Sequence, residues 1–153
     1  MLFYTTSTFR ETLTALTKKS KDGYMSVTRD VCHGLKSMPD NILRDTNDRI
    51  RHFAEYRVVK LRLPNSGQNL SKPNGFRLIY WVLMKNDVAV LLRIYPKRGS
   101  QSAVDLTDEE YNRLLIELVN ESKANMLHQV DIKNNMVELS QKACLPGSSS
   151  NLL

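Results

Sequence analysis

The stretch 75–97, GFRLIYWVLMKNDVAVLLRIYPK, decides the fold class of this chain. Aromatic and β-branched residues are dense in it, and they alternate with a period of two on both sides of Lys85-Asn86-Asp87. This pattern predicts two strands, 75–84 and 88–97, joined as an antiparallel hairpin. We expect one face of the hairpin to form the core against N-terminal helices, and we assign to it Phe76, Leu78, Tyr80, Val82, Met84, Val88, Val90, Leu92 and Ile94.

The opposite face of the hairpin collects cationic residues at one end. A third predicted strand, 56–63, precedes the hairpin and places Lys60 and Arg62 together on one side. In this register Arg77 lies roughly across from Tyr95. Three neighbouring strands are therefore predicted to bring cations onto one concave sheet surface. We assign to it Lys60, Arg62, Arg77, Arg93, Tyr95 and Lys97, with Ile79, Trp81, Leu83, Ala89 and Leu91 beside them.

The N-terminal part of the chain predicts a strand followed by a pair of helices. Residues 2–6 read as a short strand, and Thr8 is expected to cap a helix with Phe9, Leu13 and Leu16 on one face. A second helix from about Met25 carries the apolar residues Val27, Val31, Leu35 and Met38 and is expected to end before Pro39. Residues 40–55 are compatible with either a short helix or a packed loop, and the sequence leaves this choice open.

The C-terminal part predicts one helix. Thr107-Asp108-Glu109-Glu110 forms a capping box, and the residues that follow place Tyr111, Leu114, Leu115, Leu118 and Val119 on an apolar side. We expect this helix to continue intermittently to about Lys142 and residues 143–153 to form a flexible tail. The expected architecture is a single α+β domain over 1–142, in which the strand and helix pair pack on a mainly antiparallel sheet.

Composition and net charge limit the classes of partner that we expect for this protein. The chain has 153 residues and a formal net charge of +6 at pH 7, so a polyanion is a reasonable partner. No apolar run approaches the ~20 residues of a membrane span, and the N-terminus does not read as a secretion signal, so we expect a cytoplasmic protein without a membrane partner. Cys32 and Cys144 are isolated, which argues against a disulfide framework or a zinc site. We expect no metal and no small-molecule cofactor.

The basic face has the chemistry needed to cleave RNA through the neighbouring 2′-hydroxyl. This reaction requires removal of a proton, stabilisation of negative charge at phosphorus and protonation of the departing 5′-oxygen. An arginine fork can hold two phosphate oxygens, and Tyr95 or Tyr111 can stack on a base or handle a proton. Of the three histidines only His52 is expected near this face, and the general base is not identified. Taken singly, each cation also reads as an ordinary solvated or ion-paired residue.

Four segments resemble the RelE/ParE toxin superfamily: VVKLRL (58–63), NGFRLIY (74–80), LLRIYPK (91–97) and DLT (105–107) leading into a helix. The resemblance covers roughly residues 56–118. It implies a microbial-RNase-like fold and a ribosome-dependent mRNA endonuclease of a type II toxin–antitoxin system, silenced by a cognate antitoxin protein. By this resemblance Lys60 and Arg62 match the family's basic strand, Arg77 its phosphate-binding arginine, Lys97 or Arg98 its basic position after the last long strand, and Tyr111 a functional tyrosine.

The sequence departs from the family in two respects, and two alternatives to the mRNA endonuclease function remain open. The loop before Gly75 is longer than usual, which would change the position of Arg77, and the chain continues well beyond the family's normal end. One alternative is a toxin of the same fold that inhibits DNA gyrase by protein contact, although Lys60, Arg62 and Arg77 together favour RNA. The other is an inactivated relative that only binds RNA or a protein. The sequence does not give codon preference, antitoxin identity or oligomeric state.

Overall fold

The computed structural model describes residues 1–19, 22–44 and 49–142. Within these ranges, strands form one open sheet in the order β2-β3-β4-β5-β1-β6-β7. Neighbouring strands are antiparallel except β1 and β5, which are parallel. An α+β fold with a mainly antiparallel sheet is therefore confirmed. The strands are β1 (Leu2–Thr5), β2 (Arg49–His52), β3 (Tyr56–Leu63), β4 (Phe76–Leu83), β5 (Val88–Pro96), β6 (His128–Asp131) and β7 (Val137–Lys142).

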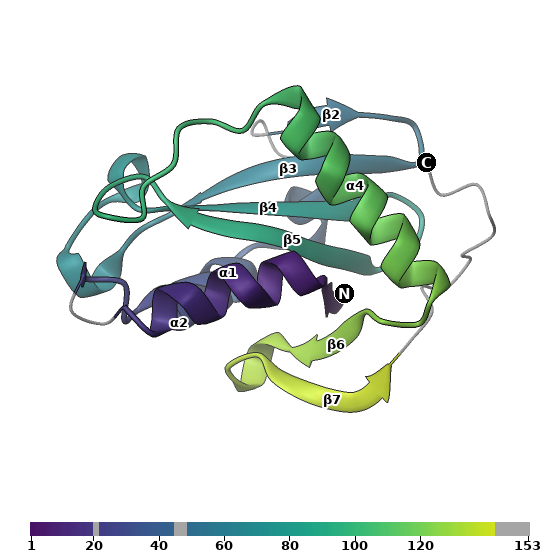
Figure 1. Cartoon of the computed structure of the whole chain (residues 1–153). Helices are drawn as coiled ribbons and strands as arrows, with labels where there is room; N and C mark the ends of the chain where they lie inside the picture. The colour runs from purple at the N-terminus through teal and green to yellow at the C-terminus, as the bar shows by residue number, and fades with distance from the viewer. Residues whose placement is uncertain (20–21, 45–48, 143–153) are drawn as a thin grey trace.

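Helices cover both faces of this sheet. α1 (Ser7–Thr17) and α2 (Val27–Ser37) lie on one face, with the short α3 (Asp40–Arg44) after them, and α4 (Asp108–Lys123) crosses the other face (Figure 1). The central strands are consequently buried on both sides, and Ile79 and Trp81 of β4 are fully enclosed. None of the helices in the described ranges is long and apolar enough to cross a membrane.

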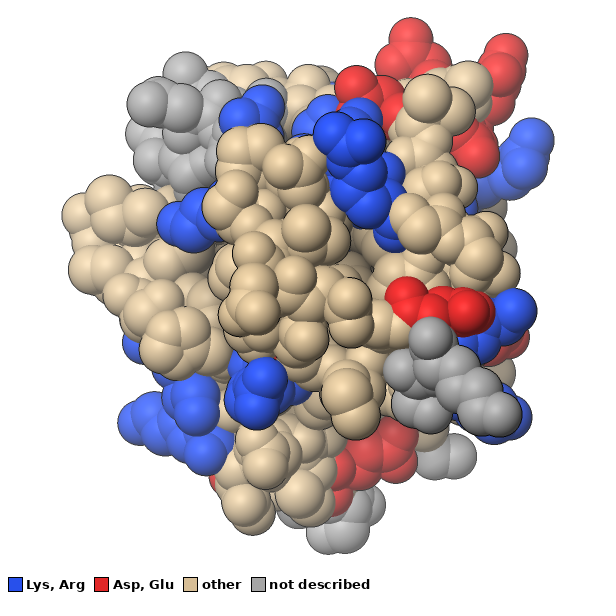
Figure 2. Space-filling view, turned by 90° about the vertical axis from the view of Figure 1, so that its left-hand side faces the viewer, with Lys and Arg blue, Asp and Glu red and all other residues tan. Residues whose placement is uncertain are grey.

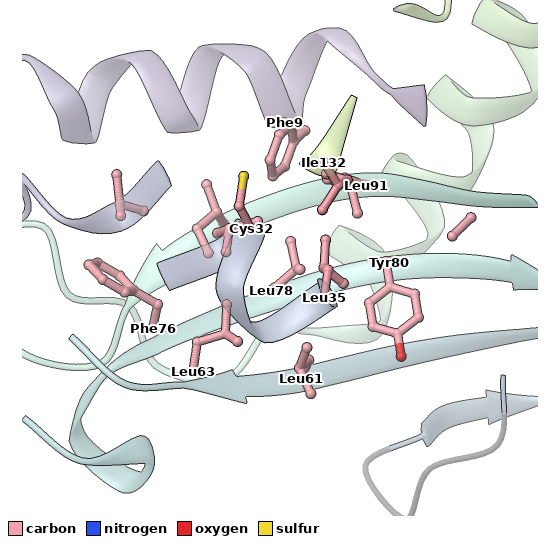
Figure 3. Close-up of a cluster of buried hydrophobic side chains, with 14 of the residues drawn as sticks. Phe9, Cys32, Leu35, Leu61, Leu63, Phe76, Leu78, Tyr80, Leu91 and Ile132 are labelled. Carbon is pink, nitrogen blue, oxygen red and sulfur yellow. The ribbon is translucent and has the colours of Figure 1, made fainter. Parts of the chain in front are cut away.

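Two apolar clusters correspond to the two faces. The first lies under α1 and α2, where Phe9, Cys32 and Leu35 meet side chains of β3, β4 and β5 (Figure 3). The second lies under α4, where Leu114 and Leu118 pack against Trp81 and its neighbours. Burial of a large apolar side chain contributes about 1.5–3 kcal/mol, so the two clusters together fix both helical layers on the sheet.

A bulge in β5 overturns part of the predicted division between faces. Ile79 pairs with Arg93 whereas Tyr80 pairs with Leu91, so one extra residue interrupts the ladder. An extra residue reverses the in–out alternation on its far side. Of the residues assigned to the face of the N-terminal helices, Ile94 is there, but Val88, Val90 and Leu92 point towards α4. Ala89 and Leu91, expected on the basic face, belong to the first cluster instead.

The N-terminal elements form as predicted, with shifted boundaries. The hydroxyl of Thr6, not of Thr8, caps α1 by accepting a hydrogen bond from the Phe9 amide at 3.3 Å. The Thr8 amide instead donates to Glu117 of α4 at 3.0 Å. α2 begins at Val27 and ends at Ser37, before Pro39 as expected. The segment whose structure the sequence left open contains α3 and the edge strand β2.

The C-terminal part agrees with the prediction only as far as the end of α4. The capping box is present: Thr107 accepts from the Glu110 amide at 3.2 Å, and the Glu110 carboxylate accepts from the Thr107 amide at 2.7 Å. The expected continuation of the helix to about Lys142 is wrong, because α4 ends at Lys123 and β6 and β7 follow. β6 pairs with β1 and extends the sheet. Residues 143–153, expected to form a tail, lie outside the described residues.

Two carboxylates of α4 hold the start of α1. The Ser7 amide donates to both carboxylate oxygens of Glu121, at 3.0 and 3.1 Å, and Arg10 lies 3.6 Å from the same carboxylate. Amides in the first turn of a helix have no partner within the helix, so Glu117 and Glu121 satisfy groups that would otherwise be unpaired. α4 is thereby tied to the opposite layer at its C-terminal end, while its N-terminal end reaches the basic residues.

Candidate functional site

Five of the predicted site residues stand in two rows across β3, β4 and β5. Lys60 pairs with Ile79, which pairs with Arg93; Arg62 pairs with Arg77, which pairs with Tyr95. Residues opposite one another in neighbouring strands point to the same face. The structure therefore brings Lys60, Arg62, Arg77, Arg93 and Tyr95 together, and the predicted pairing of Arg77 with Tyr95 is confirmed.

This face is not the open concave surface that the sequence predicts. α4 packs on it, and the apolar residues of the second cluster fill the space between helix and sheet. The cations are left where β3 and β5 end and β4 begins, beside the N-terminal turn of α4. Figure 2 views the molecule from the left-hand side of Figure 1, and Lys and Arg side chains gather there next to acidic ones in the upper part of the surface.

Arg77 is held by the loop that precedes β4. Its side chain is buried, and its two terminal nitrogens donate to the carbonyls of Lys72 and Pro73, each at 2.9 Å, and to that of Phe76 at 3.2 Å. Lys72 and Pro73 belong to a short 3₁₀ turn, Lys72–Asn74. The loop between β3 and β4 thus provides the carbonyl oxygens that orient this guanidinium, a function that the sequence could not show.

That loop is in turn anchored to α2 by a buried polar cluster. The Asp30 carboxylate accepts hydrogen bonds from the hydroxyl of Ser26 at 2.7 Å, from the amide of Ser66 at 3.0 Å and from the hydroxyl of Ser66 at 2.6 Å. The Asn65 side chain donates to the carbonyl of Gly23 at 2.8 Å. Hydrogen bonds of the Asp30 carboxylate therefore connect α2 to the loop, and hydrogen bonds of the Arg77 guanidinium connect the loop to β4.

Tyr95 lies beneath the cations. Its ring is buried, the Arg93 guanidinium carbon lies 5.7 Å from the ring centre, and its hydroxyl has no hydrogen-bond partner among the described residues. Burial raises the pKa of Tyr95 to about 12, and the carboxylate of Asp105 acts in the same direction. The hydroxyl is therefore protonated at neutral pH and can serve as a hydrogen-bond donor.

Tyr111, in the first turn of α4, joins the same neighbourhood. Burial raises its pKa, and Tyr95 and Asp105 contribute to this rise. Both rings are almost completely buried, at 3% exposure for Tyr95 and 5% for Tyr111. Neither ring therefore presents a flat exposed face on which a base could stack.

Two acidic residues of the site were missed by the sequence analysis. Asp105 lies 2.9 Å from the Lys60 ammonium, and Glu110 lies 3.8 Å from the Arg93 guanidinium. The Lys60 hydrogen bond and charge lower the pKa of Asp105, and the charges of Lys97 and Arg77 lower it further. Hydrogen bonding by the Thr107 amide is the main cause that lowers the pKa of Glu110. The one available signal was the position of Asp105 just before the capping box.

The remaining predicted residues lie at the border of the two rows. Lys97 follows β5, is half-buried, and its amide continues the ladder by donating to the Gly75 carbonyl at 2.8 Å. Arg98 is exposed and donates to the Asn74 side chain at 3.0 Å. Arg62 is exposed and forms no ion pair with any residue in the described ranges. These three side chains form the accessible part of the cluster.

The histidines do not supply the general base that the sequence left unidentified. His52 pairs with Arg57, at the end of β3 opposite to Arg62, so the expectation that it lies near the site is wrong. His33 lies on α2 and His128 is bonded to Glu138 at 2.8 Å. Within the described parts of the chain, no group of three His, Cys, Asp or Glu side chains is placed to hold a metal ion.

Comparisons of the chain with protein-family models, with curated proteins and with solved structures each found no match.

Proposed function

We propose that the chain is a metal-independent endoribonuclease, a RelE-like toxin that cleaves mRNA on the ribosome. The observation that carries this proposal is the pair of rows in which Lys60, Arg62, Arg77 and Arg93 lie over neighbouring strands with Tyr95 among them. RNA backbones are bound by Lys and Arg side chains, and arginine holds phosphate oxygens with paired donors. The cluster therefore suits a phosphodiester in its ground state and in the more negative transition state.

The proposed reaction proceeds by transesterification. The 2′-oxygen loses its proton and forms a bond to phosphorus, the bond from phosphorus to the 5′-oxygen breaks, and the departing oxygen takes up a proton. The products are a 2′,3′-cyclic phosphate and a 5′-hydroxyl end. Arg62 and Lys97 are accessible to the phosphate, and Arg77 is fixed by carbonyls before substrate arrives. A guanidinium that is already held in place contributes its positive charge to a developing negative charge without reorganisation.

The same geometry is consistent with an enzyme that acts on mRNA held by the ribosome. The site contains cations and tyrosine hydroxyls, but no histidine of this chain lies within it. Correct positioning of reacting groups can lower a barrier by about 7–11 kcal/mol, so a ribosome that presents mRNA in the right conformation would compensate for modest acid–base chemistry. We also propose a cognate antitoxin as second partner, on the basis of the resemblance, and the cytoplasm as the compartment.

One observation favours the alternative of a non-catalytic toxin that inhibits gyrase. The cations are partly satisfied within the protein, because Lys60 binds Asp105, Arg93 lies near Glu110 and Arg77 donates to three carbonyls. Such a cluster can serve to position the loop and α4 rather than to hold RNA. The two functions differ in what they predict for Arg62, which has no structural partner among the described residues.

The test is mRNA cleavage in a translating cell-free extract, with primer extension to locate the cuts. Arg62→Ala is compared with Lys85→Ala, which removes the same charge from the exposed turn between β4 and β5. Wild type and Lys85→Ala are expected to cut in codon register, and Arg62→Ala to cut at least ten-fold less. Intact message, together with inhibition of DNA supercoiling by gyrase, would overturn the proposal in favour of the alternative.

A further inference from the structure

We infer that the Asp105 carboxylate occupies the position of an RNA phosphate among Lys60, Lys97 and Arg77, so that substrate must displace it to bind. This inference rests on the proposed function and specifies its phosphate-binding position and a built-in competitor. Asp105 thereby becomes a residue that limits binding at the site. Replacing Asp105 by a neutral residue should therefore strengthen the binding of an anion at this position.

The path of the chain puts Asp105 at this position. The loop between β5 and α4 passes from the end of β5 over the sheet to the start of α4 (Figure 1), and Lys60 lies on β3, two strands away from β5. The neighbours of Asp105 are fixed: Leu106 is buried in the second cluster and Thr107 caps α4. Asp105 is therefore held near the cations by its neighbours in the chain, and its contact with Lys60 joins the loop after β5 to β3.

Charge identifies this position as an anion site. Asp105 is 66% exposed, yet its carboxylate lies 2.9 Å from the Lys60 ammonium. The cations of Lys97 and Arg77 add to the effect of Lys60 in lowering the pKa of this carboxyl group. Three cations from β3, β4 and the end of β5 thus act on one carboxylate. A phosphate group would be attracted by the same three cations, and Lys60 would donate to it as it does to the carboxylate.

A buried hydroxyl provides a second observation that points to a ligand. Tyr95 is only 3% exposed, and its hydroxyl has no hydrogen-bond partner among the described residues. The Asp105 charge contributes to the raised pKa of Tyr95. An unpaired buried donor costs free energy, so a phosphate that displaces Asp105 and thereby gains access to this hydroxyl would be stabilised by it.

The experiment measures anion binding without cleavage. Wild type, Asp105→Asn and Glu109→Gln are titrated with a 2′-O-methyl RNA oligonucleotide, which lacks the attacking hydroxyl, and with inorganic phosphate. Glu109 is exposed in the first turn of α4 and forms no ion pair with the cations among the described residues, so its substitution makes the same change in net charge away from them. Exposed ion pairs are weak, and we therefore expect Asp105→Asn to bind the oligonucleotide about two- to five-fold more tightly than both other proteins.

A double substitution tests whether the gain acts through the proposed position. In a Lys60→Ala background the addition of Asp105→Asn is expected to give a smaller gain than in the wild type, because the direct partner of Asp105 is absent and only the charges of Lys97 and Arg77 remain. Equal binding by Asp105→Asn and Glu109→Gln, or weaker binding by Asp105→Asn, would overturn the inference. Failure of the proposed function is distinguishable: binding would still tighten in Asp105→Asn, while the wild type would leave mRNA in a translating extract intact.

Discussion

Replacement of Asp30 by alanine is predicted to destabilise the protein and to release the loop that holds Arg77. Asp30 is buried on α2, and its carboxylate accepts three hydrogen bonds, one from Ser26 and two from Ser66. The substitution removes the acceptor but leaves the donors in place. The loop would lose its main attachment to α2 at the point from which it continues to the 3₁₀ turn beside Arg77.

The expected loss of stability is about 3 kcal/mol. A hydrogen bond to a charged group contributes about 1.5–3 kcal/mol, and the three bonds are not additive because Ser66 is exposed and its hydroxyl can turn to water. The Ser26 hydroxyl keeps a contact with Asn65 at 3.1 Å. The hydrogen bond from the Ser66 amide and part of the hydrogen bond from Ser26 together give a loss of about 3 kcal/mol. For a chain of this size, the melting temperature should fall by about 6–12 °C.

Urea denaturation of wild type, Asp30→Ala and Asp22→Ala provides the assay, together with hydrogen exchange of the Ser66 and Gly67 amides. Asp22 is an exposed acidic residue that receives one hydrogen bond from Ser100 at 3.0 Å, so its loss should change stability by less than about 0.5 kcal/mol. Faster exchange at Ser66 and Gly67 is expected in Asp30→Ala alone. A loss below about 1 kcal/mol, with protected loop amides, would refute the reasoning, since water would then replace the carboxylate at little cost.

Three further substitutions probe other contacts. Burial and the Glu121 charge raise the pKa of Glu117, so its contribution to stability falls as the pH rises above 4.5, the ordinary pKa of a glutamate. In urea titrations, Glu117→Gln should be more stable than the wild type by less than about 1 kcal/mol at pH 7 and equally stable at pH 4. Gly75→Ala should cost about 3 kcal/mol in the same assay, because an added Cβ would overlap the Leu63 carbonyl oxygen. Tyr95→Phe should leave stability within about 1 kcal/mol of wild type but lower mRNA cleavage about ten-fold; unchanged cleavage would remove its hydroxyl from the mechanism.

Local sequence patterns predicted the central strands, the N-terminal helix pair and the start of α4 well, but not the end of α4. Alternation over 56–63 and 75–84 gave β3 and β4 with boundaries within a residue, and the capping box at Thr107 marked the first turn of α4. The same alternation placed Lys60, Arg62 and Arg77 on one face because each lies within a regular part of its strand. These features depend on neighbours in the chain, which is why a sequence shows them.

Features that depend on distant residues could not be predicted. The bulge in β5 reversed the face of Val88, Val90 and Leu92, and nothing in a run of apolar residues marks an extra residue. β6 and β7 are short and rich in polar residues, so they lack the apolar alternation that identifies a strand, and they form because β1 offers its free edge to β6. Arg77 reads as an open phosphate ligand in the sequence, although carbonyls of the preceding loop hold it.

The measurement that tests the central claim most directly is the chemistry of the ends that the protein leaves on mRNA. Fragments from a translating extract with wild type or Arg62→Ala are treated with polynucleotide kinase with and without its 3′-phosphatase activity, and the ends are then mapped by sequencing. Attack by the 2′-hydroxyl predicts 2′,3′-cyclic phosphate and 5′-hydroxyl ends at positions that are cut by the wild type and spared by Arg62→Ala. Fragments with 5′-phosphate and 3′-hydroxyl ends at those positions, or no cuts that depend on Arg62, would contradict the account.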